Sequence, residues 1–236
     1  MIISDTHKFI FIHVPKCAGT SIRQSLYKYD TRNNFFWNYV PIAPASEEEG
    51  EPLLVDKGHM TLGVWRSLYP DAYSLINEYT VFSISRNPIS RLLSGFFEPR
   101  DILYHRLCKD NQKTKDIEDV NYKFSCYIDE INTSANFLKQ QYVHNTPQYL
   151  YTLDGNKLIH DINITLEDPE NGLNALKTIL PEIAGDVRKG LTSQKNIRES
   201  QKFLFLWDQL KVSAKMTFVE KFKKDFDLFG YAIPEF

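Results

Sequence analysis

The sequence predicts an α/β fold in which a central parallel sheet carries helices on both faces. Short apolar runs end in turn residues, and segments with helical spacing of apolar residues follow them, so strands and helices alternate along the chain. The chain has 236 residues, of which 42% are apolar and 25% charged, which is typical of a globular protein with a sizeable core. We therefore expect a single domain over residues 1–236.

The first strand-loop-helix unit lies near the start of the sequence. Residues 9–14 form a run of bulky apolar residues that ends at Pro15. Such a run is typical of a strand that is buried on both faces. Residues 20–26 favour a helix, which Gly19 or Thr20 can cap.

The second unit follows a segment that is rich in proline and acidic residues, residues 30–58, which indicates a surface loop. A second apolar run covers residues 79–85 and ends at the tripeptide RNP. Apolar residues then recur at helical spacing from Ile89 to Phe97, and Pro88 suits the first turn of that helix. The strand-loop-helix unit thus occurs twice.

The second half of the sequence begins with a strongly polar stretch, residues 99–123, which favours an excursion or lid. The apolar segment at residues 158–168 predicts a third strand, and Asp168 with Pro169 suits the cap and first turn of a helix. Apolar residues step by three or four over residues 203–226, which predicts one or two closing helices.

The net charge and the cysteine spacing narrow the range of possible ligands and indicate the redox state of the thiols. The formal net charge of -2 argues against a nucleic-acid partner, so an anion site must be local. Cys17, Cys108 and Cys126 are widely spaced, which favours reduced thiols.

The sequence also lacks the patterns of metal sites and membrane spans. No residues have metal-ligand spacing and no apolar window of about 18 residues occurs, so we expect no metal and no membrane span. The start of the sequence lacks a leader pattern, and we expect a cytoplasmic protein.

Two loops follow the carboxyl ends of predicted strands, where ligands bind in open α/β sheets. In the first, PKCAGTS, a helix N-terminus favours an anion, glycine permits close backbone approach, and Lys16 adds a charge. The lysine precedes the glycine, whereas it follows the second glycine of a Walker loop, which argues against an NTPase. A plain turn with a solvated lysine is the alternative. The candidate residues are Lys16, Cys17, Ala18, Gly19, Thr20 and Ser21.

The second loop carries Arg86 at a strand end, and Ser94 lies on the helix that follows. Arginine can bind an anion through a forked contact, and serine can add its hydroxyl. Two adjacent anion sites suit a nucleotide that has phosphate at both ends.

These motifs resemble those of the sulfotransferases that use 3'-phosphoadenosine-5'-phosphosulfate (PAPS). PKCAGTS is similar to their 5'-phosphosulfate loop, and SISRNPISRLLSGFF is similar to their 3'-phosphate motif. The ending KKDFDLFGY, residues 223–231, resembles the branch that contains the carbohydrate sulfotransferases and their bacterial relatives. The resemblance implies a P-loop-like three-layer fold, PAPS as sulfate donor, and a carbohydrate or other hydroxyl as acceptor.

The resemblance also implies roles for individual residues. It places the 5'-phosphosulfate at the first loop and the 3'-phosphate at Arg86 and Ser94. Residues 188–196 stand where the family has a loop that closes over the nucleotide, with Lys195 as a candidate contact; a solvated lysine is the alternative.

Sulfuryl transfer needs a cation at the departing oxygen and a base for the acceptor hydroxyl. Lys16 suits the first role because charge builds on the bridging oxygen in the transition state. His59, in DKGHMTLG, is the candidate base, since histidine titrates near neutrality; a surface or structural histidine is the alternative. His13 falls within the predicted strand, which favours a structural role.

Two other functions compete with a PAPS-dependent sulfotransferase. A P-loop nucleotide kinase would need an acidic Mg²⁺ ligand where this chain has Ser85 and Arg86. A non-catalytic nucleotide-binding module would keep the anion loops yet tolerate the loss of His59. The residues point to no particular acceptor or oligomeric state.

Overall fold

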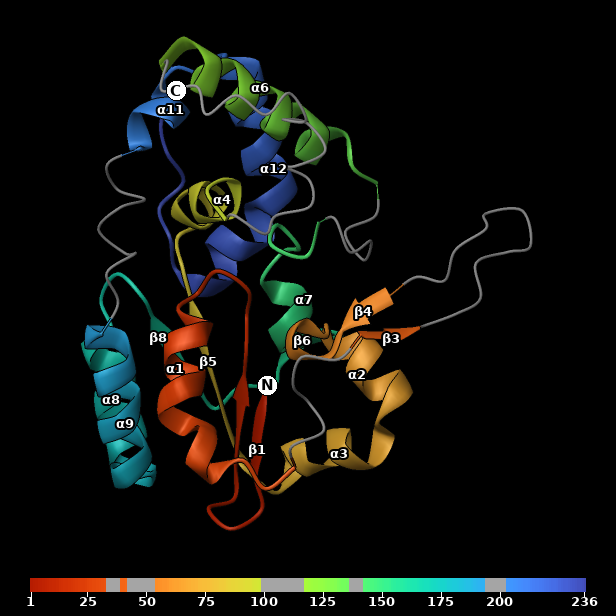
Figure 1. Cartoon of the computed structure of the whole chain (residues 1–236), viewed down its shortest axis with the longest axis vertical. Coiled ribbons are helices and arrows are strands. Elements are labelled where there is room, and N and C mark those ends of the chain that lie inside the picture. Colours follow the sequence, from red (N-terminus) through yellow and green to blue (C-terminus); the bar gives the residue numbers. More distant parts are fainter. Residues whose placement is uncertain (33–38, 42–53, 99–116, 136–141, 194–202) are drawn as a thin grey trace. The chain divides into compact units, whose positions relative to one another are not determined.

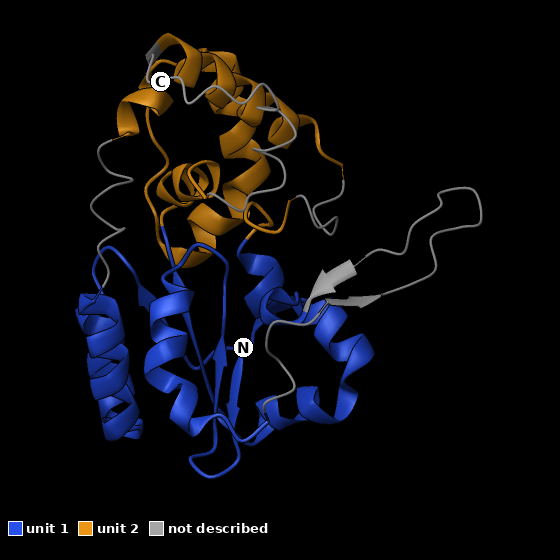
Figure 2. Ribbon diagram, viewed as in Figure 1, with its two compact units in different colours: residues 1–86, 148–194 blue, residues 87–147, 195–236 orange. Residues whose placement is uncertain are grey.

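The computed structural model (Figure 1) describes residues 1–32, 39–41, 54–98, 117–135, 142–193 and 203–236. The chain forms two compact units (Figure 2). Unit 1 contains Met1–Arg86 and Gln148–Gln194, and unit 2 contains Asn87–Pro147 and Lys195–Phe236.

Unit 1 is built on a four-stranded, mostly parallel sheet. Its order is β1 (Ile2–Ser4), β2 (Phe9–Ile12), β5 (Thr80–Ser85) and β8 (Ile162–Thr165). β2 pairs with β5 and β5 with β8 in parallel, whereas the edge strand β1 runs antiparallel to β2. All of β2 and all of β5 except Thr80 are buried, as expected for strands covered on both faces. The predicted α/β class is confirmed, and its first two strands lie where the apolar runs predicted them.

Helices flank this sheet within unit 1. α9 (Pro181–Thr192) packs against both α1 (Gly19–Leu26) and α8 (Glu170–Ile179), and α8 also packs on β8. On the other side of Figure 1 lie α2, α3 and α7, of which α2 contacts the other two. Their bounds are α2 (Leu62–Leu68), α3 (Pro70–Ser74) and α7 (Tyr149–Thr152).

The start of α8 differs from the sequence prediction. Its N-cap is Pro169 rather than Asp168, and no side chain caps it among the described residues. The carbonyl of Asp168 accepts a hydrogen bond from Thr165 Oγ1 at 2.7 Å. The threonine side chain thus stabilises a turn just before the helix.

Short elements occupy parts of the predicted surface loop at residues 30–58. β3 (Tyr39–Pro41) and β4 (Leu54–Asp56) pair antiparallel, and a 3₁₀ turn at Lys57–His59 covers the end of the loop. Another 3₁₀ turn, Tyr27–Tyr29, lies just before the loop. The rest of that segment, residues 33–38 and 42–53, lies outside the described residues. Elsewhere in unit 1, a third 3₁₀ turn covers Leu75–Asn77, and β6 (Leu153–Asp154) pairs with β7 (Lys157–Leu158).

Unit 2 is helical in the part that the structure describes. It contains α4 (Pro88–Phe96), α6 (Ile117–Thr133), α11 (Leu204–Asp208) and α12 (Val212–Phe229). The helical spacings predicted around residues 89–97 and 203–226 are confirmed. α6 begins inside the predicted polar excursion, of which residues 99–116 are not described. The core of unit 2 includes Leu93, Phe96, Phe124, Tyr127, Ile128, Phe218, Phe222 and Phe226.

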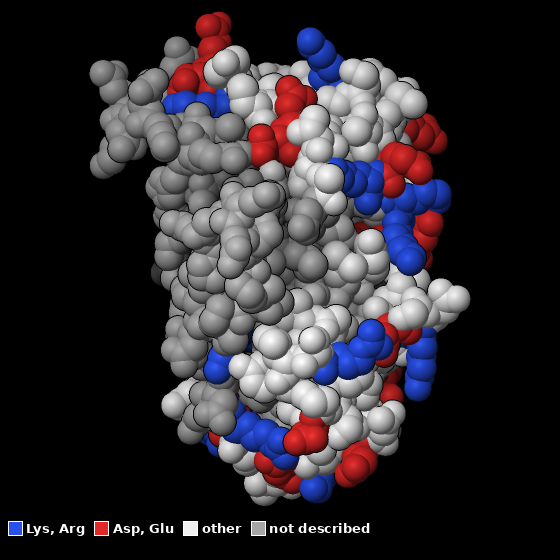
Figure 3. Space-filling model, turned by 90° about the vertical axis from the view of Figure 1, so that its right-hand side faces the viewer, with Lys and Arg blue, Asp and Glu red and all other residues white. Residues whose placement is uncertain are grey.

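Charges are mixed on the surface. On the described part of the face in Figure 3, basic and acidic side chains are interspersed rather than gathered by sign. Cys17 and Cys126 are free thiols, and Cys108 lies outside the described residues. No helix within the described ranges has the length and apolar character needed to cross a membrane.

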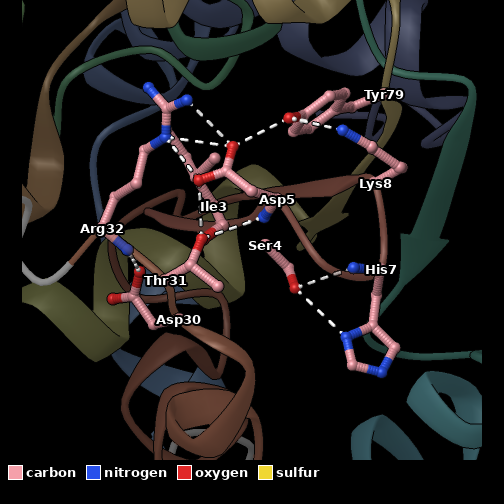
Figure 4. Close-up of polar contacts among 9 residues, drawn as sticks. All are labelled: Ile3, Ser4, Asp5, His7, Lys8, Asp30, Thr31, Arg32 and Tyr79. Carbon is pink, nitrogen blue, oxygen red and sulfur yellow. Dashed lines mark hydrogen bonds and ion pairs between the residues drawn. The ribbon is translucent and has the colours of Figure 1, made fainter.

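A polar network closes the amino end of the unit 1 sheet (Figure 4). Asp5, in the turn between β1 and β2, accepts hydrogen bonds from both Arg32 Nε and Nη2, at 2.9–3.1 Å. Tyr79 OH donates to Asp5 Oδ1 at 2.8 Å, and Thr31 Oγ1 donates to Oδ2 at the same distance. The Arg32 hydrogen bonds hold the pKa of Asp5 well below its usual range. The carboxylate therefore joins the start of β2 to the start of β5.

Candidate functional site

The loop between β2 and α1 has a strained backbone. Lys16 (φ 65°) and Ala18 (φ 68°) both adopt the left-handed conformation, which side-chain-bearing residues seldom adopt. Each such residue costs about 1–2 kcal/mol. Strain of this kind persists only where surrounding contacts impose it, and it gathers at ligand clamps.

The start of α1 is suited to an anion. Its N-cap is Ala18, and within the described residues no side chain caps the helix. The N–H groups of Gly19 and Thr20 belong to the first turn, which has no intrahelical acceptor, and the helix dipole adds partial positive charge there. Thr20 is exposed and Ser21 half-buried, so hydroxyls flank this helix start.

Gly19 permits a close contact with a histidine. A Cβ built on Gly19 would lie 1.7 Å from His13 Nε2, so the imidazole occupies the space that any side chain would need. His13 is buried, and its ring centroid lies 4.5 Å from that of His59. His13 therefore contacts both the start of α1 and the ring of His59, the predicted base.

Arg86 connects the two predicted anion loops. Its side chain follows β5, is 5% exposed, and donates from Nη1 to the main-chain oxygen of Lys16 at 3.2 Å. β2 and β5 are parallel neighbours, so their carboxyl ends meet at one edge of the sheet. The structure thus brings together the loops of Lys16 and Arg86 within unit 1.

Gln148 is a further residue at this point, and the sequence analysis does not identify it. Its side chain is fully buried at the N-terminus of α7. Nε2 donates to the carbonyl of Arg86 at 2.8 Å, while Oε1 accepts from the Arg86 N–H at 2.9 Å and from Cys17 Sγ at 3.2 Å. No local pattern marks this glutamine, because its partners lie 62 and 131 residues away in the sequence.

Buried and half-buried polar side chains also support the end of β5. Ser83 Oγ lies 3.1 Å from His160 Nδ1 and donates to Asn163 Oδ1 at 3.2 Å, and Asn163 Nδ2 donates to Ser85 Oγ at 2.8 Å. Burial lowers the pKa of His160 to about 4, although the charge of Asp161 opposes the shift. These side chains tie β5 to β8 just before Arg86.

The remaining predicted residues are placed as follows. Ser94 lies half-buried on α4 in unit 2, so its pairing with Arg86 stays a prediction. The N-terminus of α4 is capped by Asn87, whose side chain accepts from the N–H groups of Ile89 and Ser90. Lys195 lies outside the described residues. The ranges that the structure covers contain no group of three or more His, Cys, Asp or Glu residues that could hold a metal ion.

Comparison with known protein families identifies the class of this chain. A sequence profile of the sulfotransferase family matches residues 1–232, which include both loops and the C-terminal motif. The chain therefore belongs to the sulfotransferase family, and its reaction is the transfer of a sulfuryl group. Searches of curated proteins and of solved structures returned no match.

Proposed function

We propose that this protein transfers a sulfuryl group from PAPS to a hydroxyl of a carbohydrate or glycoconjugate. The observation that carries the proposal is the contact between Arg86 Nη1 and the main-chain oxygen of Lys16. It joins the loop that resembles a 5'-phosphosulfate site to the loop that resembles a 3'-phosphate site. A single adenosine bisphosphate needs such neighbouring sites.

The residues of the first loop fit one end of this donor. The first-turn N–H groups of α1, the hydroxyls of Thr20 and Ser21, and the ammonium of Lys16 are the donors that a phosphosulfate requires. Arg86 supplies the charge for the 3'-phosphate, and Ser94 and Lys195 are proposed as further contacts. The donor supplies a sulfuryl group on a phosphate leaving group.

Lys16 is proposed as the electrophilic catalyst. Negative charge grows on the bridging oxygen as the sulfur–oxygen bond breaks, so an ammonium there stabilises the transition state more than the ground state. Lys16 is half-buried, which reduces the solvent screening of its charge. Its position before Gly19 lets the lysine meet the bridging oxygen while the following turn holds the phosphate.

His59 is proposed as the base that takes the proton of the acceptor hydroxyl. Its ring lies beside His13, which packs on Gly19 at the start of α1, so the imidazole is close to the proposed position of the sulfuryl group. A neutral imidazole can accept a proton near pH 7.

Substitution of His59 tests this role. We expect His59→Ala to lower kcat by about 10²-fold or more while donor affinity is kept, because a positioned base contributes to the chemical step. His7→Ala is the matched control, since His7 contacts Ser4 at the amino end of the sheet and should leave kcat unchanged. An unchanged kcat in His59→Ala between pH 6 and 8 would remove this residue from the mechanism.

The reaction itself is tested with the full chain, PAPS that carries radiolabelled sulfate, and a panel of oligosaccharides and simple alcohols. We expect label to appear on a carbohydrate hydroxyl. If only the simple alcohols become labelled, the proposal of a carbohydrate acceptor is wrong. Phosphate transfer from ATP with Mg²⁺ in place of sulfate transfer would favour the kinase alternative.

A further inference from the structure

We propose that Gln148 is a positioning residue that sets the arrangement of the two donor-binding loops, an inference that rests on the proposed function. Its amide contacts the main chain of Arg86 and the side chain of Cys17, and both partners belong to unit 1. These contacts are with the main chain of Arg86 and the thiol of Cys17. Gln148 acts on the donor through the positions of Arg86 and of the loop that contains Cys17.

On the Arg86 side, the amide continues the hydrogen bonding of the sheet. The last carbonyl of β5, that of Ser85, accepts from the N–H of Leu166, which follows β8. Arg86 comes next, and Gln148 satisfies both its N–H and its carbonyl, at 2.9 and 2.8 Å. Two contacts on one residue fix its peptide planes, and these fix the direction in which the guanidinium leaves the chain.

On the first-loop side, the amide holds the residue between the two strained positions. Cys17 is 1% exposed and stands between the left-handed Lys16 and Ala18. Its thiol donates to the same Oε1 that accepts from Arg86 N–H. A thiol is a weak donor, yet a buried contact here stabilises a backbone that local preferences disfavour.

Only an amide of this length satisfies all three partners. Oε1 accepts hydrogen bonds from Arg86 N–H and Cys17 Sγ, and Nε2 donates to the carbonyl of Arg86. A glutamate would place a negative charge against that carbonyl. An apolar side chain would leave these buried hydrogen-bonding groups without this partner. Gln148 makes no capping contact with α7 within the described residues. Its side chain therefore serves the two loops rather than its own helix.

The test compares Gln148→Met with a matched control, Thr152→Val. Methionine keeps the length and removes the hydrogen bonds. Thr152 is equally buried on the same short helix, and its Oγ1 has no hydrogen-bond partner among the described residues, so valine should change little. We expect Gln148→Met to raise the Kd for 3'-phosphoadenosine-5'-phosphate about tenfold or more, and Thr152→Val to change it less than about twofold.

The KM for PAPS and the thermal unfolding midpoint separate positioning from stability. A positioning role predicts a rise in KM and in Kd at temperatures well below the unfolding midpoint. A lower midpoint with unchanged Kd and KM would show a merely structural glutamine and overturn the inference.

Cys17 provides a second test that holds even if Gln148→Met does not fold. Cys17→Ala removes the hydrogen bond to Gln148 Oε1, whereas Cys17→Ser keeps a donor, so the alanine variant should have a Kd a few-fold higher than the serine variant. If Gln148→Met folds, Cys17→Ala should raise the Kd less in that background than in the parent, because the Cys17–Gln148 hydrogen bond is already lost. Equal Kd values for the alanine and serine variants would contradict the inference.

Binding of 3'-phosphoadenosine-5'-phosphate by the unsubstituted protein distinguishes a failure of this inference from a failure of the proposed function. If the parent does not bind 3'-phosphoadenosine-5'-phosphate, the proposed donor is wrong. If the parent binds it and Gln148→Met binds it equally well, the donor stands and the positioning role of Gln148 is rejected.

Discussion

The two ends of the unit 1 sheet use charge in different ways. At the amino end, Asp5 is paired with Arg32 and hydrogen-bonded by Tyr79, so the charges neutralise each other. At the carboxyl end, the guanidinium of Arg86 instead reaches the main-chain oxygen of Lys16, beside the start of α1. Cationic groups and a helix N-terminus thus gather at one edge of the sheet, and the polar groups there can serve an anionic ligand.

Left-handed residues that bear side chains occur in the described loops at both ends of the sheet, Lys16 and Ala18 at the carboxyl end and Lys8 at the amino end. The first loop at the carboxyl end contains two left-handed residues that bear side chains, at Lys16 and Ala18, and such residues cost folding free energy. At the amino end, the left-handed Lys8 lies beside the Asp5 network and donates to Tyr79 OH at 3.2 Å. We infer that the amino end contributes to stability and the carboxyl end to binding and transfer, and the following substitutions test that division.

Lys16→Ala should have the largest effect. Loss of a cation at the departing oxygen should lower kcat by about 10²- to 10³-fold with little change in the Kd for 3'-phosphoadenosine-5'-phosphate. Lys8→Ala is the matched control, because Lys8 also has a positive φ but lies at the amino end. Steady-state kinetics and calorimetry provide the two readouts, and equal losses of kcat and affinity in Lys16→Ala would contradict its assigned role.

Arg86→Gln should act on binding first. Removal of a charge-assisted contact to the 3'-phosphate should raise the Kd for 3'-phosphoadenosine-5'-phosphate about 10- to 100-fold, with a smaller change in kcat at saturating donor. Arg32→Gln removes the guanidinium that pairs with Asp5 and should leave this Kd unchanged. The same loss of affinity in both variants would show that the effect is not specific to the carboxyl end.

His160 should make stability depend on pH. Its pKa in the folded protein is about 4, below the usual 6.5, so the unfolded chain binds a proton first as the pH falls. The free energy of unfolding should therefore fall by about 2.5 kcal/mol between pH 6.5 and 4, and His160 should lower it only slightly more below pH 4.

Urea unfolding at a series of pH values measures this dependence. His160→Gln cannot take up the proton, so it should lose most of the slope between pH 6.5 and 4. Asp186 has a pKa of about 2 because Lys28 hydrogen-bonds it, so its contribution to stability is lost only at lower pH. An unchanged slope in His160→Gln would reject the assignment.

Asp5→Asn should have the smallest effect. The pair with Arg32 is about one-third exposed, so solvent screens it and the free energy of unfolding should fall by about 1 kcal/mol. The Kd for 3'-phosphoadenosine-5'-phosphate should not change. Chemical denaturation and calorimetry check the two statements, and weakened donor binding in Asp5→Asn would undermine the separation of the two ends.

Local patterns predicted much of this fold. The apolar runs at residues 9–14 and 79–85 became β2 and β5, and the helical spacing after Pro88 became α4, because strand burial and helix periodicity are properties of neighbouring residues. The strand predicted at residues 9–14 ends at Ile12, and His13, the next residue, packs against Gly19. A boundary of that kind depends on tertiary contact.

Long-range contacts set the parts that the sequence did not reveal. Gln148 and Arg86 meet across 62 residues of sequence, and a glutamine after a proline carries no local sign of that role. The antiparallel pairing of β1 with β2 was likewise not predicted, although the polar turn between two apolar runs was a hairpin signal. By contrast, the neighbouring positions of Lys16 and Arg86 follow from the rule that parallel strands present their carboxyl ends at one edge.

Calorimetric titration of the full chain with 3'-phosphoadenosine-5'-phosphate tests most directly whether the two loops bind one nucleotide. We predict one molecule bound per chain, an affinity that falls with Arg86→Gln, and weaker binding of ATP with Mg²⁺. An absence of binding, or a preference for ATP with Mg²⁺, would contradict the account.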